Sequence, residues 1–211
     1  MLDEGKKVTF GVVADTHVPD RVKNLPAQML ATFRDLEPDG ILHAGDACNK
    51  WVVQTLEEIA PVTIVQGNRD FFFGLRSPIN ERIDVNGLKI VIAHGHRSLF
   101  HYFIDKVATI RYGYRFTRYY QQLHQDFPEA NIIIFGHTHH QTARWVEGQL
   151  LFNPGVAYPC KYNNFEPQYG VLSITAEGLI QTHFYGPKNA SRRGGKFFQW
   201  IDKMSKSKEE V

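Results

Sequence analysis

Short apolar segments alternate with amphipathic ones along the first third of the chain. Residues 7–14, 40–45 and 61–67 are hydrophobic runs of strand length bounded by turn-forming residues, which predicts buried strands. Between them, the apolar positions of residues 25–36 and 49–60 recur at helical spacing. Strand, helix, strand, helix, strand is the order typical of right-handed crossovers in a mainly parallel sheet. The pattern therefore predicts an α/β fold.

After residue 80 the pattern changes to pairs of strands joined by turn residues. Three segments predict β-hairpins: residues 81–95, 140–155 and 169–185. The first has its turn at Asn86-Gly87, a dipeptide favoured in tight hairpins, and the third at Glu177-Gly178. The second half of the chain is thus expected to add antiparallel strands.

The chain has 211 residues, which suits one domain with a sizeable core. We expect that domain to span residues 1–190, with a helical insert over about residues 98–126. The lysine- and glutamate-rich segment 191–211 predicts a partly disordered tail.

Overall charge and cysteine content narrow the range of binding partners and cellular locations to be expected. Charged residues make up 22% of the chain and the net charge is +2, so stable nucleic-acid binding is not expected from the total charge. The two cysteines, Cys48 and Cys160, form no C-x-x-C pair, which argues against a disulfide framework and a thiolate zinc site. No segment has the length and hydrophobicity of a signal peptide or a membrane span. We expect a cytoplasmic protein without a membrane partner.

Each of five predicted strands is followed by side chains of metal-ligand type. These are Asp15 and His17; Asp46; Asn68; His94 and His96; and His137, His139 and His140. Since the carboxyl ends of strands in open α/β sheets are where ligands bind, the five ends are expected to meet in one crevice. In extended chain, residues i and i+2 point the same way, so Asp15 and His17 should address one ion or two adjacent ones. The same holds for His137 and His139.

Any one of these residues has a simpler explanation. An aspartate at a strand end is commonly a turn or cap residue, and a single histidine is commonly a hydrogen-bonded core residue. Independent caps do not explain why every one of these strand ends carries Asp, Asn or His and none carries Ser, Thr or Lys. The joint pattern therefore predicts a site.

The types of ligand indicate the chemistry. Imidazole, carboxylate and amide groups without thiolate suit Mn, Fe, Ni or Zn, and seven such groups are too many for one tetrahedral ion. Two divalent ions against two carboxylates leave a positively charged site, which attracts an anionic substrate and activates water at neutral pH. Hydrolysis of a phosphate ester follows more naturally than attack on a neutral amide.

Five short motifs follow one another along the chain: "DTH" at 15–17, "GD" at 45–46, "GN" at 67–68, His94 in "AHGH", and "GHTH" at 136–139. Together they resemble the calcineurin-like metallophosphoesterase family, in its small single-domain branch of bacterial and archaeal phosphodiesterases. The resemblance spans about residues 7–185. It implies a two-sheet mixed β-sandwich flanked by helices, a four-layer α/β/β/α arrangement.

The resemblance also implies roles for the seven ligand-type residues. Asp15, His17 and His139 would hold one ion, Asn68, His94 and His137 would hold the other, and Asp46 would bridge them. A metal-bridging hydroxide would then attack phosphorus. The two divalent ions, of Mn, Ni, Fe or Zn, are the expected cofactors.

The chain departs from the family pattern after the "GN" motif. Many members have a histidine there, the usual candidate for protonating the leaving group, whereas this chain has Arg69. Arg69 either stabilises phosphate charge or is a solvated arginine, and Asp70 is expected to orient a neighbouring group. Without the acid, substrates whose leaving group needs little protonation are favoured, such as aryl or nucleoside esters. His96 and His140 lie beside ligands, where a supporting or substrate-contacting role and an exposed position remain open.

The helical insert carries two side-chain patterns. Phe100, Phe103, Ile104 and Val107 recur at helical spacing and predict a core or interface face, so a homo-oligomer stays open. Arg111, Arg115 and Arg118 follow at i, i+4 and i+7 among tyrosines. They form either a solvated basic face or a lid that meets an anionic substrate.

The sequence thus leaves three functions to compare. The leading one is a dimetal phosphodiesterase acting on a small or nucleotide-like ester. The alternatives are a non-catalytic scaffold, as in the retromer subunit of this family, and a nuclease; the intact ligand set and the low net charge, respectively, argue against them. The predicted catalytic set is Asp46, Arg69, Asp70 and His96, and the predicted substrate-binding set is Arg69, His96, Arg111 and Arg115.

Overall fold

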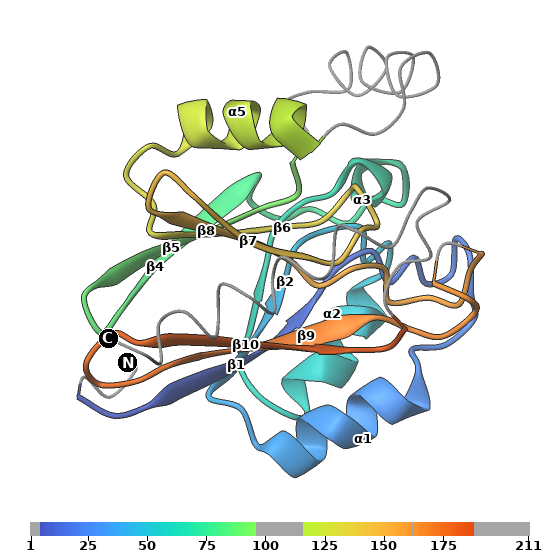
Figure 1. The fold of residues 1–211 in the computed structure, drawn as a ribbon. Helices are drawn as coiled ribbons and strands as arrows, with labels where there is room; N and C mark the ends of the chain where they lie inside the picture. The colour runs from blue at the N-terminus through green and yellow to red at the C-terminus, as the bar shows by residue number, and fades with distance from the viewer. Residues whose placement is uncertain (1–4, 96–115, 162, 188–211) are drawn as a thin grey trace.

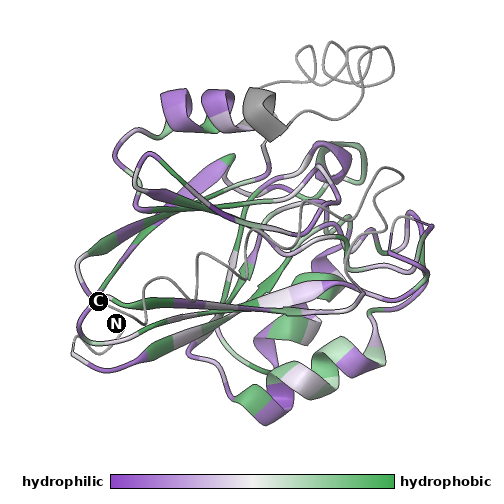
Figure 2. Ribbon diagram, in the orientation of Figure 1, coloured by the Kyte–Doolittle hydropathy of each residue, from purple (hydrophilic) through white to green (hydrophobic). Residues whose placement is uncertain are grey.

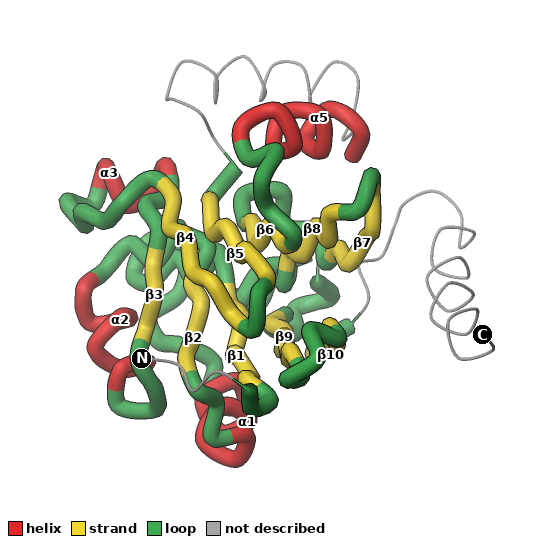
Figure 3. The backbone as a smooth tube through the Cα atoms, turned by 90° about the vertical axis from the view of Figure 1, so that its left-hand side faces the viewer, coloured by secondary structure: helices red, strands yellow, loops and turns green. Residues whose placement is uncertain are grey.

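Two five-stranded sheets lie face to face in the computed structural model, which describes residues 5–95, 116–161 and 163–187 (Figure 1). Helices α1 and α2 cover the outer face of the first sheet, and α5 covers the outer face of the second. Figure 3, turned by 90°, shows the same succession of layers. The α/β/β/α arrangement implied by the resemblance is therefore confirmed.

The first sheet has the strand order β10-β9-β1-β2-β3. β1, β2 and β3 are parallel, β9 is antiparallel to β1, and β10 is antiparallel to β9. The predicted crossovers are present, with α1 between β1 and β2 and α2 between β2 and β3. The elements are β1 (Val8–Val13), α1 (Ala27–Leu36), β2 (Gly40–His43), α2 (Lys50–Glu57), β3 (Val62–Ile64), β9 (Tyr169–Ile174) and β10 (Ile180–Tyr185).

The second sheet has the order β4-β5-β6-β8-β7. The predicted hairpins β4/β5 and β7/β8 are antiparallel, whereas β5, β6 and β8 run parallel to one another. A short helix, α3, connects the two sheets. The elements are α3 (Asn68–Phe72), β4 (Asn80–Val85), β5 (Leu88–Ala93), α5 (Phe116–Asp126), β6 (Ile132–Phe135), β7 (Thr142–Val146) and β8 (Gln149–Asn153).

Three buried apolar clusters hold the layers together. The central one lies between the sheets and is built from alternate strand residues such as Val12, Ile92 and Phe152. A second packs α1 and α2 against the first sheet, and a third packs α5 against the second. Hydrophobic and hydrophilic residues both occur on α1 and α5, as Figure 2 shows, because each helix has one buried face. The parallel strands β2, β6 and β8 are buried on both faces along their whole length, which explains their continuous apolar sequence.

The helical insert is described only in part. α5 forms the end of the predicted segment, while residues 96–115 lie outside the described residues. Residues 188–211 also lie outside the described residues, and with them the predicted tail at 191–211. The structure therefore does not test the expectations for the following residues of the insert: His96, Phe100, Phe103, Ile104, Val107, Arg111 and Arg115. No helix among the described residues is long and apolar enough to span a membrane.

Candidate metal centre

The predicted ligands follow β1, β2, β3, β5 and β6 at one end of the two sheets, on loops except for Asn68, which is the first residue of α3. Their backbone differs from the extended conformation expected of them. Asp15 and His17 have φ of 53° and 49°, and His137 and His139 have φ of 65° and 57°, all in the left-handed region. Asp46 has φ of 59°. The paired residues therefore converge through left-handed turns, and the i, i+2 argument from extended chain was wrong about the geometry that brings them together.

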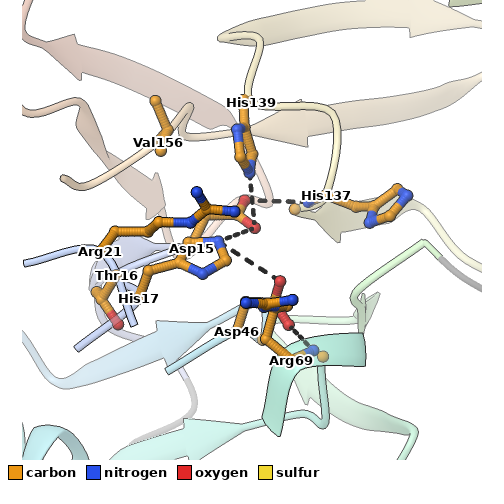
Figure 4. Close-up of polar contacts among 12 residues, drawn as sticks. Asp15, Thr16, His17, Arg21, Asp46, Arg69, His137, His139 and Val156 are labelled. Atoms are coloured by element: carbon orange, nitrogen blue, oxygen red, sulfur yellow. Dashed lines mark hydrogen bonds and ion pairs between the residues drawn. The ribbon is translucent and has the colours of Figure 1, made fainter. Parts of the chain in front are cut away.

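Asp15 lies at the centre of the cluster and is fully buried. Its Oδ1 is 3.4 Å from Nε2 of His139 and 3.7 Å from Nε2 of His17. Its Oδ2 accepts a hydrogen bond of 3.0 Å from the backbone N–H of His137. Figure 4 shows His139 above this carboxylate, His137 beside it and Asp46 below it.

Asp46 lies between two imidazole rings. Its Oδ2 is 3.5 Å from Nε2 of His17 and 3.5 Å from Nε2 of His94. Its Oδ1 accepts a hydrogen bond of 2.7 Å from the backbone N–H of Arg69. This carboxylate faces both the His17 side and the His94 side of the cluster at equal distance, and Oδ1 of Asp15 lies slightly farther from the same two rings, at 3.7 and 4.0 Å.

Asn68 gathers the remaining two ligand-type residues. Its Oδ1 is 3.2 Å from Nε2 of His94 and 3.1 Å from Nδ1 of His137. The other ring nitrogen of His94 donates to the carbonyl of Ala44 at 2.7 Å, which fixes the orientation of the ring. All seven residues of the predicted ligand set are thus brought into one cluster.

The donor atoms of this cluster fit divalent cations. Among the described residues, Oδ1 of Asp15 and Nε2 of His17 are buried without a hydrogen-bond partner. Donor atoms of Asp15, His17 and His139 lie within 4.8 Å of one another, as do those of Asp15, Asp46 and His94. Unsatisfied buried acceptors that face one another are costly unless a ligand or ion occupies the space between them.

The electrostatics of the cluster also favour a bound cation. Burial alone lowers the pKa of His94, yet the carboxylates of Asp46 and Asp15 raise it to about 10. Burial alone raises the pKa of Asp15, but the histidines around it, His139 foremost, hold that pKa well below its ordinary value. The site therefore has a negative potential that favours bound positive charge.

Asp70 has the geometry of an orienting residue. Its buried carboxylate accepts hydrogen bonds from the backbone N–H groups of Asp46 at 3.0 Å, Cys48 at 2.6 Å and Gly67 at 2.7 Å. These bonds fix the loop that carries Asp46 against the start of α3. Gly67 is required there because a Cβ at this position would overlap the carboxylate of Asp46.

Arg69 is paired with a carboxylate and is therefore not simply solvated, and its role in stabilising phosphate charge stays a prediction. Its Nη2 and Nε donate to the two carboxylate oxygens of Asp20 at 2.6 and 3.0 Å. The guanidinium is 32% exposed and stays at the rim of the cluster. Sequence reasoning did not identify Asp20. The only indication in the sequence is that it is an acidic residue three positions after His17. Figure 4 shows Arg69 beside Asp46, where their backbone-to-carboxylate bond holds it.

Asn153 is a second residue that the sequence pattern did not reveal. Its fully buried side chain donates to the carbonyl of Gly136 at 2.9 Å and to Oγ1 of Thr138 at 3.1 Å, and accepts from the N–H of Gly155 at 2.9 Å. These bonds hold the loop between β6 and β7, which carries His137 and His139.

Replacing Asn153 with alanine is expected to lower the free energy of unfolding by about 1–3 kcal/mol, because the carbonyl of Gly136 loses a buried donor and the N–H of Gly155 loses its acceptor. Chemical denaturation of the metal-free protein measures this. Thr142→Ala, which removes a partly buried hydroxyl in the same loop region, is the comparison. Equal loss in both variants would contradict a special role for Asn153.

His140 lies in this same loop and is partly buried. Burial and the charge of the adjacent His139 lower its pKa. Its backbone N–H donates to Oγ1 of Thr138 at 3.4 Å, and a supporting or substrate-contacting role for its side chain stays a prediction. The predicted roles of His96, Arg111 and Arg115 concern residues outside the described part of the chain.

A model of the calcineurin-like phosphoesterase superfamily domain matches residues 8–177. The chain belongs to this superfamily. Membership makes it a metallophosphoesterase, a class of hydrolase that binds divalent metal ions and acts on phosphate esters. The cluster at the strand ends is the candidate metal centre of this calcineurin-like phosphoesterase.

Similar proteins come from archaea and eukaryotes. A probable metallophosphoesterase of Methanothermobacter thermautotrophicus is 33% identical over 171 residues, covering 81% of this chain and 88% of that protein. Vacuolar protein sorting 29 from Cryptosporidium parvum has a TM-score of 0.62 at 16% identity, covering 87% of this chain and 100% of that one. A novel archaeal phosphodiesterase has a TM-score of 0.54 at 21% identity, covering 84% and 100%. The two structures show likeness of fold.

Proposed function

We propose that this calcineurin-like phosphoesterase is a dimetal phosphodiesterase of the cytoplasm, acting on small or nucleotide-like phosphate esters. The observation that carries the proposal is the position of Asp46, whose carboxylate oxygen is equidistant from His17 and His94. Two groups of donors meet at this one carboxylate. Such an arrangement suits two ions that share a bridging ligand.

The contacts among the ligands support a division between two ions, with Asp15 and Asp46 close to both groups of histidines. Asp15, His17 and His139 would hold one ion, and Asn68, His94 and His137 the other, with Asp46 between them. When bound, the ions would lower the pKa of coordinated water and neutralise charge on the phosphoryl oxygens. Mn, Ni, Fe and Zn all suit these nitrogen and oxygen donors.

The protein's own groups would bind and orient the ester. Arg69 places a guanidinium at the rim of the centre, where it can donate to a phosphoryl oxygen while it stays bonded to Asp20. Asp70 keeps the backbone of Asp46 in place. Arg69 is permanently charged and cannot act as an acid that protonates the leaving group. We therefore propose esters whose leaving groups need little protonation.

Diesters are preferred in this proposal for an electrostatic reason. A phosphomonoester dianion gains most from several cationic groups around its terminal oxygens, whereas a diester monoanion needs fewer. Arg69 and Arg21 both approach the carboxylate of Asp20, so among the described residues they form a partly neutralised pair of cations and not several free ones. The archaeal phosphodiesterase that shares this fold is consistent with the proposal, although that likeness concerns the fold.

The alternative is a non-catalytic scaffold, which the likeness to vacuolar protein sorting 29 keeps in view. Buried, mutually facing donors are costly to keep without ions, which supports a metal site that catalysis requires and a scaffold does not. Elemental analysis after loading with Mn or Ni separates the two. The proposal expects about two ions per chain, and trace metal alone would favour the scaffold.

Hydrolysis of matched substrates tests the reaction itself. We expect the protein loaded with Mn or Ni to hydrolyse the p-nitrophenyl diester of phosphate with a higher kcat/KM than the p-nitrophenyl monoester, and Mg to support less activity. A preference for the monoester under all metals would overturn the diester assignment and leave the dimetal phosphoesterase standing. Absence of hydrolysis of either ester by fully loaded protein would overturn the enzyme.

A further inference from the structure

Asp20 is a nearly buried carboxylate, 10% exposed, on the loop that follows β1. Four donors from three side chains surround it. Nε of Arg69 at 3.0 Å, Nδ1 of His17 at 3.2 Å and Nε of Arg21 at 3.3 Å approach Oδ2, and Nη2 of Arg69 at 2.6 Å approaches Oδ1. The residue belongs to none of the ligand motifs. It contacts two residues of the centre from outside the ligand cluster.

The contact with His17 determines which ring nitrogen faces the ligand cluster. With Nδ1 directed at Asp20, Nε2 is the nitrogen that lies near Oδ1 of Asp15 and Oδ2 of Asp46. The ring of Tyr158 meets the His17 ring edge-on, with 5.2 Å between centroids, and limits its rotation. A carboxylate bonded to the far nitrogen of a ligating histidine fixes the tautomer and strengthens the ligand.

The contact with Arg69 fixes the other end of a residue that is already anchored. The backbone N–H of Arg69 donates to Oδ1 of Asp46 at 2.7 Å, and its guanidinium forms the two-pronged pair with Asp20. A long, flexible side chain is thereby held in one position at the rim of the centre. Bidentate pairs of this kind add geometric specificity as well as energy.

We propose that Asp20 is a positioning residue that sets His17 and Arg69 at the same time, so that the metal ligand and the phosphate-binding cation keep a fixed spacing. The part that concerns Arg69 rests on the function proposed above. The part that concerns His17 rests on its contacts with the candidate metal centre alone.

A carboxylate is needed because both oxygens are used. An asparagine offers one acceptor oxygen, which can still serve Nδ1 of His17 and Nε of Arg69, but its NH₂ group would face the Nη2–H donor of Arg69 and break the two-pronged pair. Alanine removes both contacts. The two substitutions therefore separate the two roles of Asp20.

Calorimetric titration with Mn²⁺ tests the His17 role without any turnover. We expect Asp20→Ala to bind Mn²⁺ about 10-fold more weakly or worse, since loss of such supporting contacts typically costs 10–100-fold. Asp20→Asn should recover most of that affinity, and Arg69→Ala should leave it within about 2-fold. Asp35→Asn, which removes an equal charge from the exposed side of α1, is the matched control and should bind like the unsubstituted protein.

Steady-state kinetics at saturating Mn²⁺ tests the Arg69 role. Asp20→Ala, Asp20→Asn and Arg69→Ala should each raise KM for the p-nitrophenyl diester several-fold. In the Arg69→Ala background, Asp20→Asn should add no further rise, because the group through which it acts is gone. Additive effects of the two substitutions would overturn this half of the inference.

The outcomes separate the inference from the function. If unsubstituted protein bound no Mn²⁺, both would fall. If Asp20→Ala bound Mn²⁺ as tightly as unsubstituted protein, the His17 half would fall alone. If Asp20→Ala does not fold, Asp20→Asn remains for the test, and in it the Nη–H NMR signal of Arg69 should broaden as its exchange with water accelerates. An unchanged signal would overturn the Arg69 half.

Discussion

Asp46→Asn is expected to lower kcat/KM for the p-nitrophenyl diester by about 100-fold or more. The substitution removes the charge of the one carboxylate that lies 3.5 Å from both His17 and His94. Both proposed ions lose an anionic ligand together, so the second ion cannot compensate for weakened binding of the first. Kinetics at fixed Mn²⁺, with elemental analysis of the same samples, measures both effects.

The fold should survive this substitution. An amide at position 46 still accepts the backbone N–H of Arg69, and the N–H of residue 46 still donates to Asp70. The thermal midpoint of the metal-free variant is therefore expected within a few degrees of the unsubstituted protein. Asp35→Asn again controls for the change of one charge. Retention of most activity by Asp46→Asn, with two ions bound, would show that Asp46 is not the bridge.

Gly67→Ala is expected to abolish measurable binding of at least one ion, although glycine is no ligand. Its φ of −87° suits any residue, so backbone strain is not the cause. A Cβ would overlap both the carboxylate and the backbone nitrogen of Asp46 and would displace the proposed bridge. Forcing an atom into such a packed site costs about 1–3 kcal/mol in stability as well.

Gly74→Ala is the matched control for this effect. Gly74 follows α3 in the same region, has a φ of +72°, and would place its Cβ in open space. Its replacement costs backbone strain of order 1 kcal/mol yet moves nothing in the metal centre. Calorimetric Mn²⁺ titration of the two variants should therefore differ sharply. Full Mn²⁺ binding by Gly67→Ala would contradict the contact between this position and Asp46.

The succession of strands and helices along the chain was largely readable from hydrophobic periodicity and turn residues. Apolar runs of strand length and helices with one apolar stripe identified β1, α1, β2, α2 and β3, and the dipeptides at 86–87 and 177–178 located the turns of two of the three predicted hairpins. The division into two sheets came from the resemblance. Periodicity reports which face of a strand is buried, and it carries no information about which sheet a strand joins.

The candidate centre could be predicted from the sequence because most of its residues directly follow predicted buried strands. Ligand-type side chains directly after buried strands share an edge of the fold whatever the loops do, which is why His94 and Asn68 could be grouped before their contacts were known. Asp20 could not be grouped in this way. It lies in mid-loop, and its partner Arg69 is 49 residues away in sequence. Long-range pairs between loops depend on tertiary geometry alone.

The left-handed turns at Asp15, His17, Asp46, His137 and His139 would make the lifetime of the protein depend on its supply of metal if these residues bind the proposed ions. Each residue holds a conformation that non-glycine residues avoid, and strained backbone of this sort costs about 1–3 kcal/mol per residue. Ions that bind only the folded chain would return stability in proportion to their concentration, about 2.7 kcal/mol at 100 times Kd. In a cell short of the ion, the metal-free chain would unfold and be degraded more often. Its abundance would then report metal availability even with transcription unchanged.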